Sequence, residues 1–368
     1  MDIYDKYKNK DLIDSVSDDF DFCLKNYKVY NQDDSLLCWI YAGCNTIKYD
    51  ISQAINVGME NIDISINYLS FYDRYEKINK IYDEIIYNDY DENNIKYLLF
   101  NYVNPYGDFN HFKYLVSKYG IVFENQMPIT ENNYIPNDIN NLLKQKIVAD
   151  INELKSTSNL DSKLQLKKKY MSELYQILTT IFGIPPKNTI IGNINMPVNE
   201  FYNNYIKDII NDYIGVCCLD KLGYNEYHDV NFLDMKIDDY KYYNLELSKV
   251  KDTVINSLNN YEPVWFGCSF RYISASRKNK DGILDDELYN FTKLGIKKLS
   301  KSLAEKYDML DYTHAMVFTG YSNKPERKWK VLNTFGEENN KKGYFVMSDN
   351  FFDSSVFIIG INKKFLKI

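Results

Sequence analysis

The stretch NQDDSLLCWIYAGCNTI, residues 31–47, sets Cys38 at the start of an apolar segment, six positions after Gln32. From Cys38 to about Val57 the apolar residues recur every three to four positions, which predicts a helix. A thiol at a helix N-terminus lies near unpaired N–H groups and the positive end of the helix dipole, which stabilise a thiolate. The competing interpretation is an inert cysteine in the core, directly before Trp39.

A cysteine nucleophile needs a base, and the chain has three histidines. His111 follows a glycine-bearing loop and His228 lies in the polar stretch YNEYHDVN, so either can be an ordinary surface residue. His314 instead begins the apolar run HAMVFTGY, an unusual position for a solvated imidazole. We therefore expect His314 to be the base.

An imidazole base works best when a third group fixes its tautomer and its plane. Asn333, in KWKVLNTFGEE, follows His314 by nineteen residues and comes after a predicted turn at about 322–327. Two antiparallel strands joined by that turn can bring the two side chains together. An asparagine beside a turn is common in proteins, so on its own Asn333 is more simply interpreted as an ordinary turn residue than as a partner of His314.

The order of elements predicts the fold class. Helical periodicity covers 64–87, 109–119 and about 137–181, with a loop rich in Asn, Asp and Pro after the first of these and a shorter helix near MPVNEFYNNYIKDII. Past about residue 214 the chain reads as short β-rich runs: PVWFGCSF, HAMVFTGYS, KWKVLNTFG, KGYFVMS and SSVFIIGIN. Helices first and strands later indicate an α+β fold with two lobes.

Composition disfavours several functions. The net charge is −7 with both signs interleaved, which argues against nucleic-acid binding. The most basic stretch, KLQLKKKYMSEL at 163–174, has helical spacing and is interpreted as a solvated helix face, with phosphate binding as the alternative.

Localisation and cofactors follow from what the sequence lacks. The start has no apolar signal region and no apolar run approaches the length of a membrane span, so we expect a cytoplasmic protein with no membrane partner. The six cysteines show no CxxC spacing and are interpreted as free thiols, and we expect no metal or other cofactor.

Together these motifs resemble the papain-like cysteine peptidases of peptidase family C1, in which the order Gln, Cys, His, Asn is characteristic. The closer resemblance is to the bleomycin hydrolase and aminopeptidase C branch, and it runs from about residue 29 to the last strand. The stretches that carry it, besides those around the four residues, are ISINYLSFYDRYEKIN, YGIVFENQMPIT, FGIPP, PVWFGC, GILDDELYNF and NTFGEENNKKGYFVMSDNFF.

The resemblance implies a papain-like fold in four segments. These are an N-terminal arm (1–28), a helical lobe carrying the nucleophile (29–130), a mainly helical insertion (131–235) and a β-barrel-like lobe carrying His and Asn (236–368). It also implies roles: Cys38 attacks the peptide carbonyl, His314 transfers the proton, Asn333 orients the ring and Gln32 forms an oxyanion hole.

Three further residues are expected from the resemblance to bind substrate. Gly107 matches the second glycine of the family's substrate-facing loop, Trp39 is expected to pack beside the nucleophile, and Phe335 stands where a tryptophan usually shields the asparagine. Two departures matter. Tyr106 replaces the preceding glycine and is expected to narrow the cleft, and Leu36 and Leu37 replace the usual Gly and Arg before the cysteine, giving a stiffer loop.

The resemblance therefore predicts a cysteine peptidase acting on peptides. Members of the branch are aminopeptidases because a C-terminal tail blocks the cleft; that tail is expected to be absent here, which leaves an endopeptidase as an alternative. Members also form hexameric barrels, so a homo-oligomer is open for this chain. The alternative from another class is a papain-like binding or structural protein whose catalysis is impaired.

Overall fold

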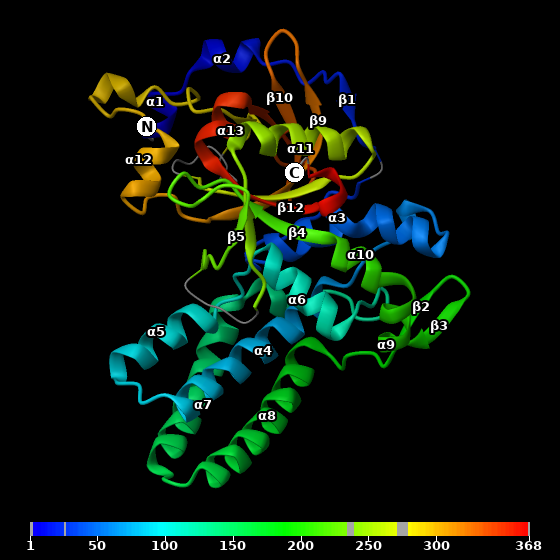
Figure 1. Cartoon of the computed structure of the whole chain (residues 1–368), viewed down its shortest axis with the longest axis vertical. Helices are drawn as coiled ribbons and strands as arrows, with labels where there is room; N and C mark the ends of the chain where they lie inside the picture. The colour runs from blue at the N-terminus through cyan, green and yellow to red at the C-terminus, as the bar shows by residue number, and fades with distance from the viewer. Residues whose placement is uncertain (1–2, 26, 234–238, 271–278, 367–368) are drawn as a thin grey trace.

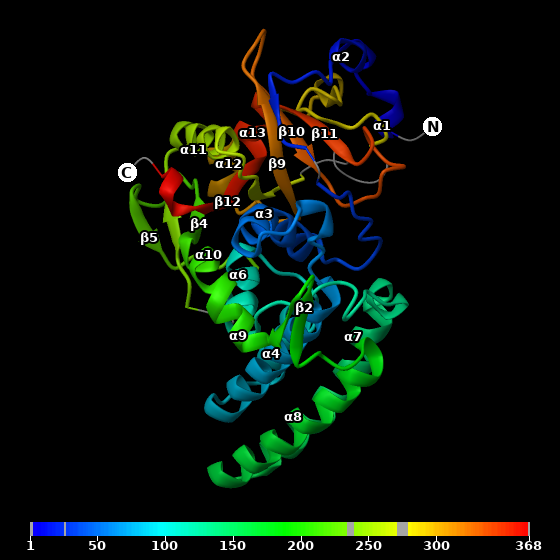
Figure 2. The same cartoon turned by 90° about the vertical axis from the view of Figure 1, so that its right-hand side faces the viewer.

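The structure, a computed structural model, describes residues 3–25, 27–233, 239–270 and 279–366. A large β-sheet occupies the upper part of the molecule in Figures 1 and 2, and long helices form the lower part. Helix α3 (Cys38–Ile55) lies between them, in contact with two strands of the sheet and with two of the lower helices. The cysteine that begins α3 is therefore placed where the two parts of the molecule meet.

The helical part packs around α3. Gly43 allows a close approach there, because a Cβ at this position would lie 2.5 Å from the ring of Phe112. Side-chain N-caps begin several helices: the oxygens of Ser65, Asp108 and Asn159 each accept a hydrogen bond from the N–H three residues later. The helical elements before residue 130 are α1 (Ile3–Lys6), α2 (Lys10–Ser15), α3, the 3₁₀ turn η1 (Met59–Asn61), α4 (Ile66–Tyr87), α5 (Glu92–Tyr102) and α6 (Phe109–Tyr119).

Two antiparallel helices project from the bottom of the molecule (Figure 1). They are α7 and α8, and α4 packs against both of them. A two-stranded hairpin and a short irregular helical stretch return the chain to the sheet. The elements of this region are η2 (Glu131–Tyr134), α7 (Pro136–Ser156), α8 (Leu160–Phe182), β2 (Asn188–Ile191), β3 (Ile194–Pro197), α9 (Val198–Phe201), the π-helical turn η3 (Tyr202–Ile206) and α10 (Lys207–Asp212).

Besides the β2–β3 hairpin, the described residues form one large mixed sheet with the strand order β5-β6-β4-β12-β7-β9-β10-β11-β8, and β1 pairs with β9 beside this path. Its central strands are antiparallel, and Trp265, Phe266 and Phe318 fill its core. The strands are β1 (Phe22–Cys23), β4 (Tyr213–Cys217), β5 (Glu226–His228), β6 (Tyr242–Asn244), β7 (Val264–Cys268), β8 (Ile283–Leu284), β9 (His314–Ser322), β10 (Lys328–Leu332), β11 (Tyr344–Ser348) and β12 (Val356–Asn362). Helical elements between these strands are α11 (Leu247–Asn259), η5 (Phe291–Leu294), α12 (Lys301–Lys306) and α13 (Asp349–Ser355), and η6 (Lys363–Phe365) follows β12.

The predicted α+β class is confirmed, and several elements match closely. The helix predicted at 109–119 is α6, and the five β-rich runs contain β7, β9, β10, β11 and β12. The helical pattern expected over about 137–181 is confirmed, as two helices separated by residues 157–159. Two expectations at the level of elements were wrong: the loop predicted after residue 87 contains α5, and α11 interrupts the β-rich part.

The division of the chain at residues 28, 130 and 235 stays a prediction. Two observations bear on how its segments meet. Strand β1, from the arm, pairs with β9, and β4, from the end of the segment predicted as an insertion, pairs with β12 and β6. The arm and the end of the insertion segment are thus both built into the large sheet.

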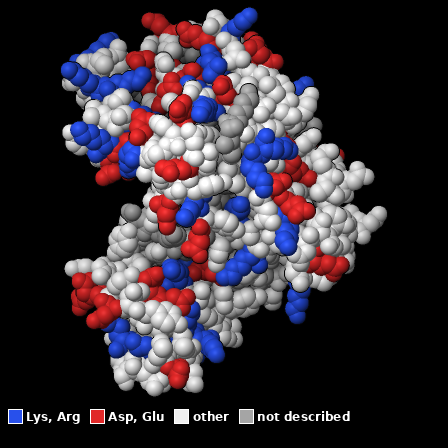
Figure 3. All heavy atoms as spheres, in the orientation of Figure 1, with Lys and Arg blue, Asp and Glu red and all other residues white. Residues whose placement is uncertain are grey.

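The surface seen in Figure 3 mixes Lys and Arg with Asp and Glu over all parts of that face, without a field of one sign. This agrees with the interleaving of charge in the sequence. Among the described residues, helices of sufficient length and apolarity to cross a membrane are absent.

Candidate active site

Cys38 is the first residue of α3, and the backbone turns sharply just before it. Leu36 has φ 63°, in the left-handed region, and Leu37 is the N-cap, without a side-chain capping bond. The thiol accepts backbone hydrogen bonds, including one from Ala315, which lower its pKa. Burial acts in the opposite direction and prevails, raising the pKa of Cys38 to about 11. The helix N-terminus alone therefore does not produce a thiolate, and ionisation requires a partner that takes the proton.

His314 begins β9 and is the residue before Ala315, whose backbone contacts the Cys38 sulfur. Its ring Nε2 lies 2.9 Å from Oδ1 of Asn333, which directly follows β10. Both side chains are buried, with exposed fractions of 5% and 0%. The β9–β10 hairpin thus brings the predicted His and Asn together, as the sequence spacing suggested.

Asn333 is itself held by the loop after β10. Its N–H donates to the carbonyl of Gly343 at 2.9 Å, and its Nδ2 donates to Oδ1 of Asn340 at 3.3 Å. With the amide nitrogen engaged in this way, Oδ1 is the end that faces His314. An acceptor at this position requires a proton on Nε2, so Nδ1 becomes the nitrogen that exchanges a proton elsewhere.

Two aromatic rings cover the His314 imidazole. Phe335 stacks on it with centroids 5.1 Å apart and an interplanar angle of 26°, and Phe270 lies at 5.3 Å. Phe335 is 8% exposed. The phenylalanine at this position therefore packs directly on the histidine, and it keeps water from one face of the ring.

Gln32 is buried and tied to the same loop. Its side-chain Oε1 accepts a 2.6 Å hydrogen bond from the Thr334 hydroxyl, and its N–H donates to the carbonyl of Thr334 at 2.8 Å. Because Oε1 is used, Nε2 is the end of the amide that can donate elsewhere. An isolated antiparallel β-bridge between Asn31 and Phe335 also joins these two segments. The segment before the cysteine is thus anchored to the residues that follow Asn333.

A pocket of about 270 Å³ opens beside Cys38. Its lining residues come from both parts of the molecule: Leu36, Cys38, Trp39, Tyr106, Gly107, Leu233, Tyr312 and Thr313. Tyr106 is the most exposed of the predicted cleft residues, at 43%. A mainly apolar lining next to a thiol suits the side chain of a bound peptide better than a charged ligand.

Gly107 has a packing role that the sequence did not indicate. A Cβ there would lie 2.4 Å from the ring of Trp39, so the packing of this tryptophan requires a glycine at position 107 whether or not substrate binds there. Trp39 is 1% exposed and donates its Nε1–H to the carbonyl of Pro105 at 2.8 Å. Trp39 and Gly107 therefore pack directly on each other where they line the pocket.

The two other histidines are engaged elsewhere. The expectation that His111 can be a surface residue was wrong: it is 3% exposed and its Nδ1 lies 2.8 Å from Oδ1 of Asp108, because the N-cap of α6 folds back on it. His228 places Nε2 2.7 Å from the carbonyl of Gly223. Neither lines the pocket beside Cys38.

Several residues of the site were missed from the sequence. Thr334, Tyr312, Leu233 and Lys77 contact either the predicted residues or the pocket wall. Thr334 directly follows Asn333 in the stretch NTFGE, so the sequence motif could have pointed to it. The others depend on contacts between distant segments, for which the sequence carries no local signal.

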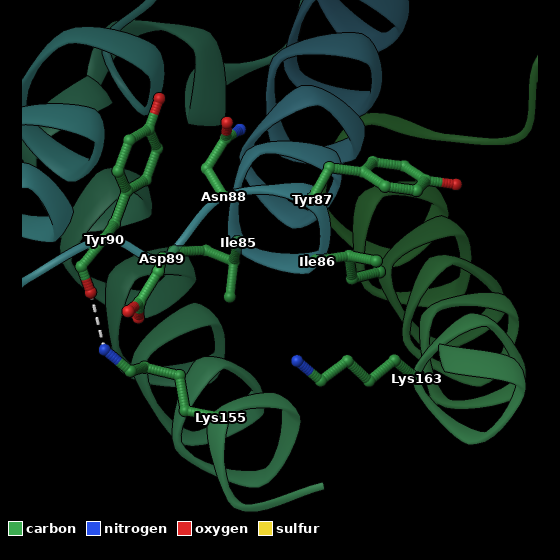
Figure 4. A pocket seen from close by; sticks show the side chains of 8 residues that line it. All are labelled: Ile85, Ile86, Tyr87, Asn88, Asp89, Tyr90, Lys155 and Lys163. Carbon is green, nitrogen blue, oxygen red and sulfur yellow. Dashed lines mark hydrogen bonds between the residues drawn. The ribbon is translucent and has the colours of Figure 1, made fainter. Parts of the chain in front are cut away.

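A second pocket lies at the far end of the helical part, where α7 and α8 meet the end of α4 (Figure 4). Lys155 donates to the carbonyl of Tyr90 at 2.6 Å, and Lys163 points into the hollow. Lys163 begins the basic stretch 163–174, now within α8. Further along that stretch, Lys167 and Lys169 pair with Asp83 and Glu173. These ion pairs favour the interpretation of the stretch as a solvated helix face.

Comparison with known proteins agrees with the geometry. Aminopeptidase C of Listeria innocua is 30% identical over 365 residues, covering 92% of this chain and 81% of that protein. Bleomycin hydrolase of Rattus norvegicus is 25% identical over 371 residues, covering 91% and 80%. The crystal structure of PepW from Lactobacillus rhamnosis superimposes with a TM-score of 0.87 at 28% identity, covering 99% of this chain and 86% of that one.

A family model described as the Peptidase C1-like family matches residues 1–368. The match includes both the segment that carries the cysteine and the hairpin that carries the histidine. With a papain-like α+β fold and relatives of this kind over most of its length, the chain belongs to the Peptidase C1-like family and is a cysteine peptidase.

Proposed function

We propose that the chain hydrolyses peptide bonds with Cys38 as nucleophile, His314 as general base and acid, and Asn333 as the group that orients His314. The observation that carries the proposal is the 2.9 Å contact between His314 Nε2 and Asn333 Oδ1, next to a backbone segment that contacts the Cys38 sulfur. An imidazole fixed at one nitrogen presents the other for proton transfer.

The raised pKa of Cys38 defines the first step. The Cys38 S–H gives its proton to His314 Nδ1, and the resulting imidazolium stabilises the thiolate that burial alone disfavours. The sulfur then forms a bond to the peptide carbonyl carbon, and the C=O electron pair moves to oxygen. When the C–N bond breaks, His314 returns the proton to the leaving amine.

Gln32 and the backbone N–H of Cys38 are the proposed oxyanion hole. The Gln32 side chain is restrained by Thr334 through Oε1, so its NH₂ group is available to donate. Two donors aimed at the tetrahedral oxyanion stabilise the transition state more than the ground-state carbonyl. Water then attacks the thioester, with His314 again as base, and releases the acid product.

The proposed substrates are peptides, and the names of the relatives support removal of an N-terminal residue. Cleavage within a chain is the alternative mode. Leucine anilide with a free amino group and the same anilide with an acetylated amino group distinguish the two modes. An aminopeptidase cleaves only the free form, whereas an endopeptidase accepts the acetylated form. A homo-oligomer stays a prediction, which light scattering on the purified chain would test.

The decisive experiment compares Cys38→Ala and His314→Ala with Cys23→Ala, which removes a thiol in β1. We expect both site variants to lose turnover by about 10⁴-fold or more and the control to retain it. Full activity in Cys38→Ala would exclude the proposal. A wild-type chain that folds but turns over no peptide would favour the impaired binding protein instead.

A further inference from the structure

The loop at residues 104–107 forms one wall of the pocket beside Cys38, between α5 and α6. It has no regular secondary structure, yet each of its four carbonyl oxygens accepts a hydrogen bond from a side chain of another segment. The pairs are Lys77 Nζ with Asn104 O (3.1 Å) and with Tyr106 O, Trp39 Nε1 with Pro105 O (2.8 Å), and the Tyr312 hydroxyl with Gly107 O (2.9 Å). The wall is therefore held from α4, from α3 and from the segment before β9.

Lys77 supplies two of these four bonds from a fully buried position on α4. Its Nζ lies 2.7 Å from Oδ2 of Asp73, one turn earlier, and the side chains are 1% and 0% exposed. The other two N–H groups of the ammonium donate to the carbonyls of Asn104 and Tyr106. Every proton of the group thus has an acceptor, which a buried ammonium requires.

Stability does not by itself account for a buried ion pair at this position. Burying two charges costs several kcal/mol per ion, and a well-packed apolar pair commonly serves a core equally well. An apolar pair, however, leaves the carbonyls of Asn104 and Tyr106 without donors. The distinctive consequence of Lys77 is therefore a defined loop conformation.

The helical insertion reaches the same loop. Asn140, on α7, donates through Nδ2 to Oδ1 of Asn104 at 3.1 Å, and Arg74 of α4 donates to Oδ1 of Asn140 at 2.7 Å. This second tie holds a side chain of the loop, whereas Lys77 holds its backbone. The loop is therefore restrained through a side chain as well as through its backbone.

We propose that Lys77 is a positioning residue for peptide binding: it fixes the backbone of residues 104–107 so that Tyr106 and Gly107 form the wall against which the substrate lies. Lys77 does not touch the peptide and acts through the loop. The proposal rests on the proposed function. It predicts that losing Lys77 weakens substrate binding while the chemistry at Cys38 is preserved.

The test uses the full chain and the double variant Lys77→Met with Asp73→Asn, which removes both members of this buried ion pair together. We expect KM for the peptide anilide to rise about 10- to 100-fold, because a displaced wall misplaces the substrate, with kcat changed less. The rate at which iodoacetamide alkylates Cys38 should stay within about twofold, because this small reagent makes no use of the loop. Lys251→Met is the matched control, since Lys251 is a buried lysine paired with Asp349 and Asp353, outside the pocket. It should leave KM unchanged.

Tyr312→Phe provides an independent measurement if the double variant does not fold. It deletes only the hydroxyl that holds the carbonyl of Gly107 and keeps the ring in place. A raised KM with unchanged alkylation supports the same restraint on the loop. A folded double variant, or failing that a Tyr312→Phe variant, with wild-type KM would overturn the inference. Absence of peptide turnover in the wild type would instead remove the proposed function.

Discussion

Leu36 adopts a backbone conformation that a leucine rarely takes, with φ 63° two residues before Cys38. For a residue with a Cβ this region costs about 1–2 kcal/mol, whereas glycine pays nothing. A glycine, which the resemblance leads one to expect at this position, would adopt this φ without the cost, whereas this chain holds a leucine in the strained conformation. Such strain next to a nucleophile persists because the surrounding contacts impose it.

Glycine should therefore outperform alanine at this site. We expect Leu36→Gly to be more stable to urea than Leu36→Ala by about 1 kcal/mol, the reverse of their order inside a helix. Both variants lose the leucine side chain, so their difference isolates the backbone term. Equal free energies of unfolding would show that φ at this position relaxes in the variants.

The reactivity of Cys38 should depend on His314 through pH. Burial raises the pKa of the Cys38 thiol to about 11, so without an imidazolium partner the thiolate forms only at alkaline pH. We expect wild-type Cys38 to react with iodoacetamide at neutral pH and His314→Ala to react appreciably only as the pH approaches that value. Rapid alkylation of His314→Ala at pH 7 contradicts a thiolate that depends on the histidine.

Glu262 makes a separate prediction about stability. It is 3% exposed, and burial, followed by the charge of Asp50, raises its pKa to about 7 despite the opposing ion pair with Lys364. Because the folded pKa exceeds the unfolded value, the folded state holds the proton more tightly, and stability is lost as the pH rises from about 4.5 to 7.

Glu262→Gln resembles the protonated form at every pH. We expect it to be more stable than the wild type by about 2 kcal/mol at pH 8, with the advantage disappearing near pH 4.5. Urea unfolding at the two pH values measures the change, and Glu326→Gln, in the exposed β9–β10 turn, is the control. A difference that does not vary with pH would assign the effect to the Lys364 contact alone.

At the scale of elements, the break between α7 and α8 depends on Asn159. Its side chain accepts a hydrogen bond from the N–H of Ser162 at 3.1 Å and caps α8. Replacing such a cap with alanine costs about 1 kcal/mol. We expect Asn159→Ala to speed amide hydrogen exchange in the first turn of α8, measured by mass spectrometry. Ser158→Ala, at the exposed neighbouring position, should leave it unchanged.

The break itself shows where sequence patterns lose information. The helical pattern of about 137–181 contains no proline or glycine, so it indicates helix without showing where the chain reverses between α7 and α8, which both pack on α4. Helix α5 was missed for a different reason. Among its residues only Leu98 and Tyr102 are buried, so its apolar stripe is too sparse to stand out from an Asn-rich loop.

The predicted site shows the same contrast. Cysteine and histidine are rare in this chain, so Cys38 and His314 could be singled out by type, position and apolar surroundings. Lys77 is one of 44 lysines and arginines, and its importance comes from burial against a loop almost thirty residues away. Local patterns reveal residues of unusual chemistry, whereas supporting residues require the packed structure.

At the scale of the whole molecule, the segment predicted as the N-terminal arm is hydrogen-bonded to the β9–β10 hairpin. Leu24 donates to the carbonyl of Thr319 at 2.7 Å, and Asp21 receives the N–H of Asn323 at 3.0 Å. The arm then continues into Gln32, the proposed oxyanion donor. The position of Gln32 thus depends on how the start of the chain lies against a hairpin near its end.

Gly320 is the point of closest approach between the two. A Cβ at this position would lie 2.6 Å from the carbonyl oxygen of Phe22, a backbone atom that cannot move alone. We expect Gly320→Ala to push β1 away from β9, so that limited proteolysis cleaves the arm faster than in the wild type. Because the arm leads to Gln32, kcat should fall as well, whereas iodoacetamide alkylation of Cys38 should change little. Gly223→Ala is the control, since its Cβ meets only the flexible Glu226 side chain. An unchanged arm in Gly320→Ala would mean that β9 yields instead, and Gln32 would then be positioned by Thr334 without help from β1.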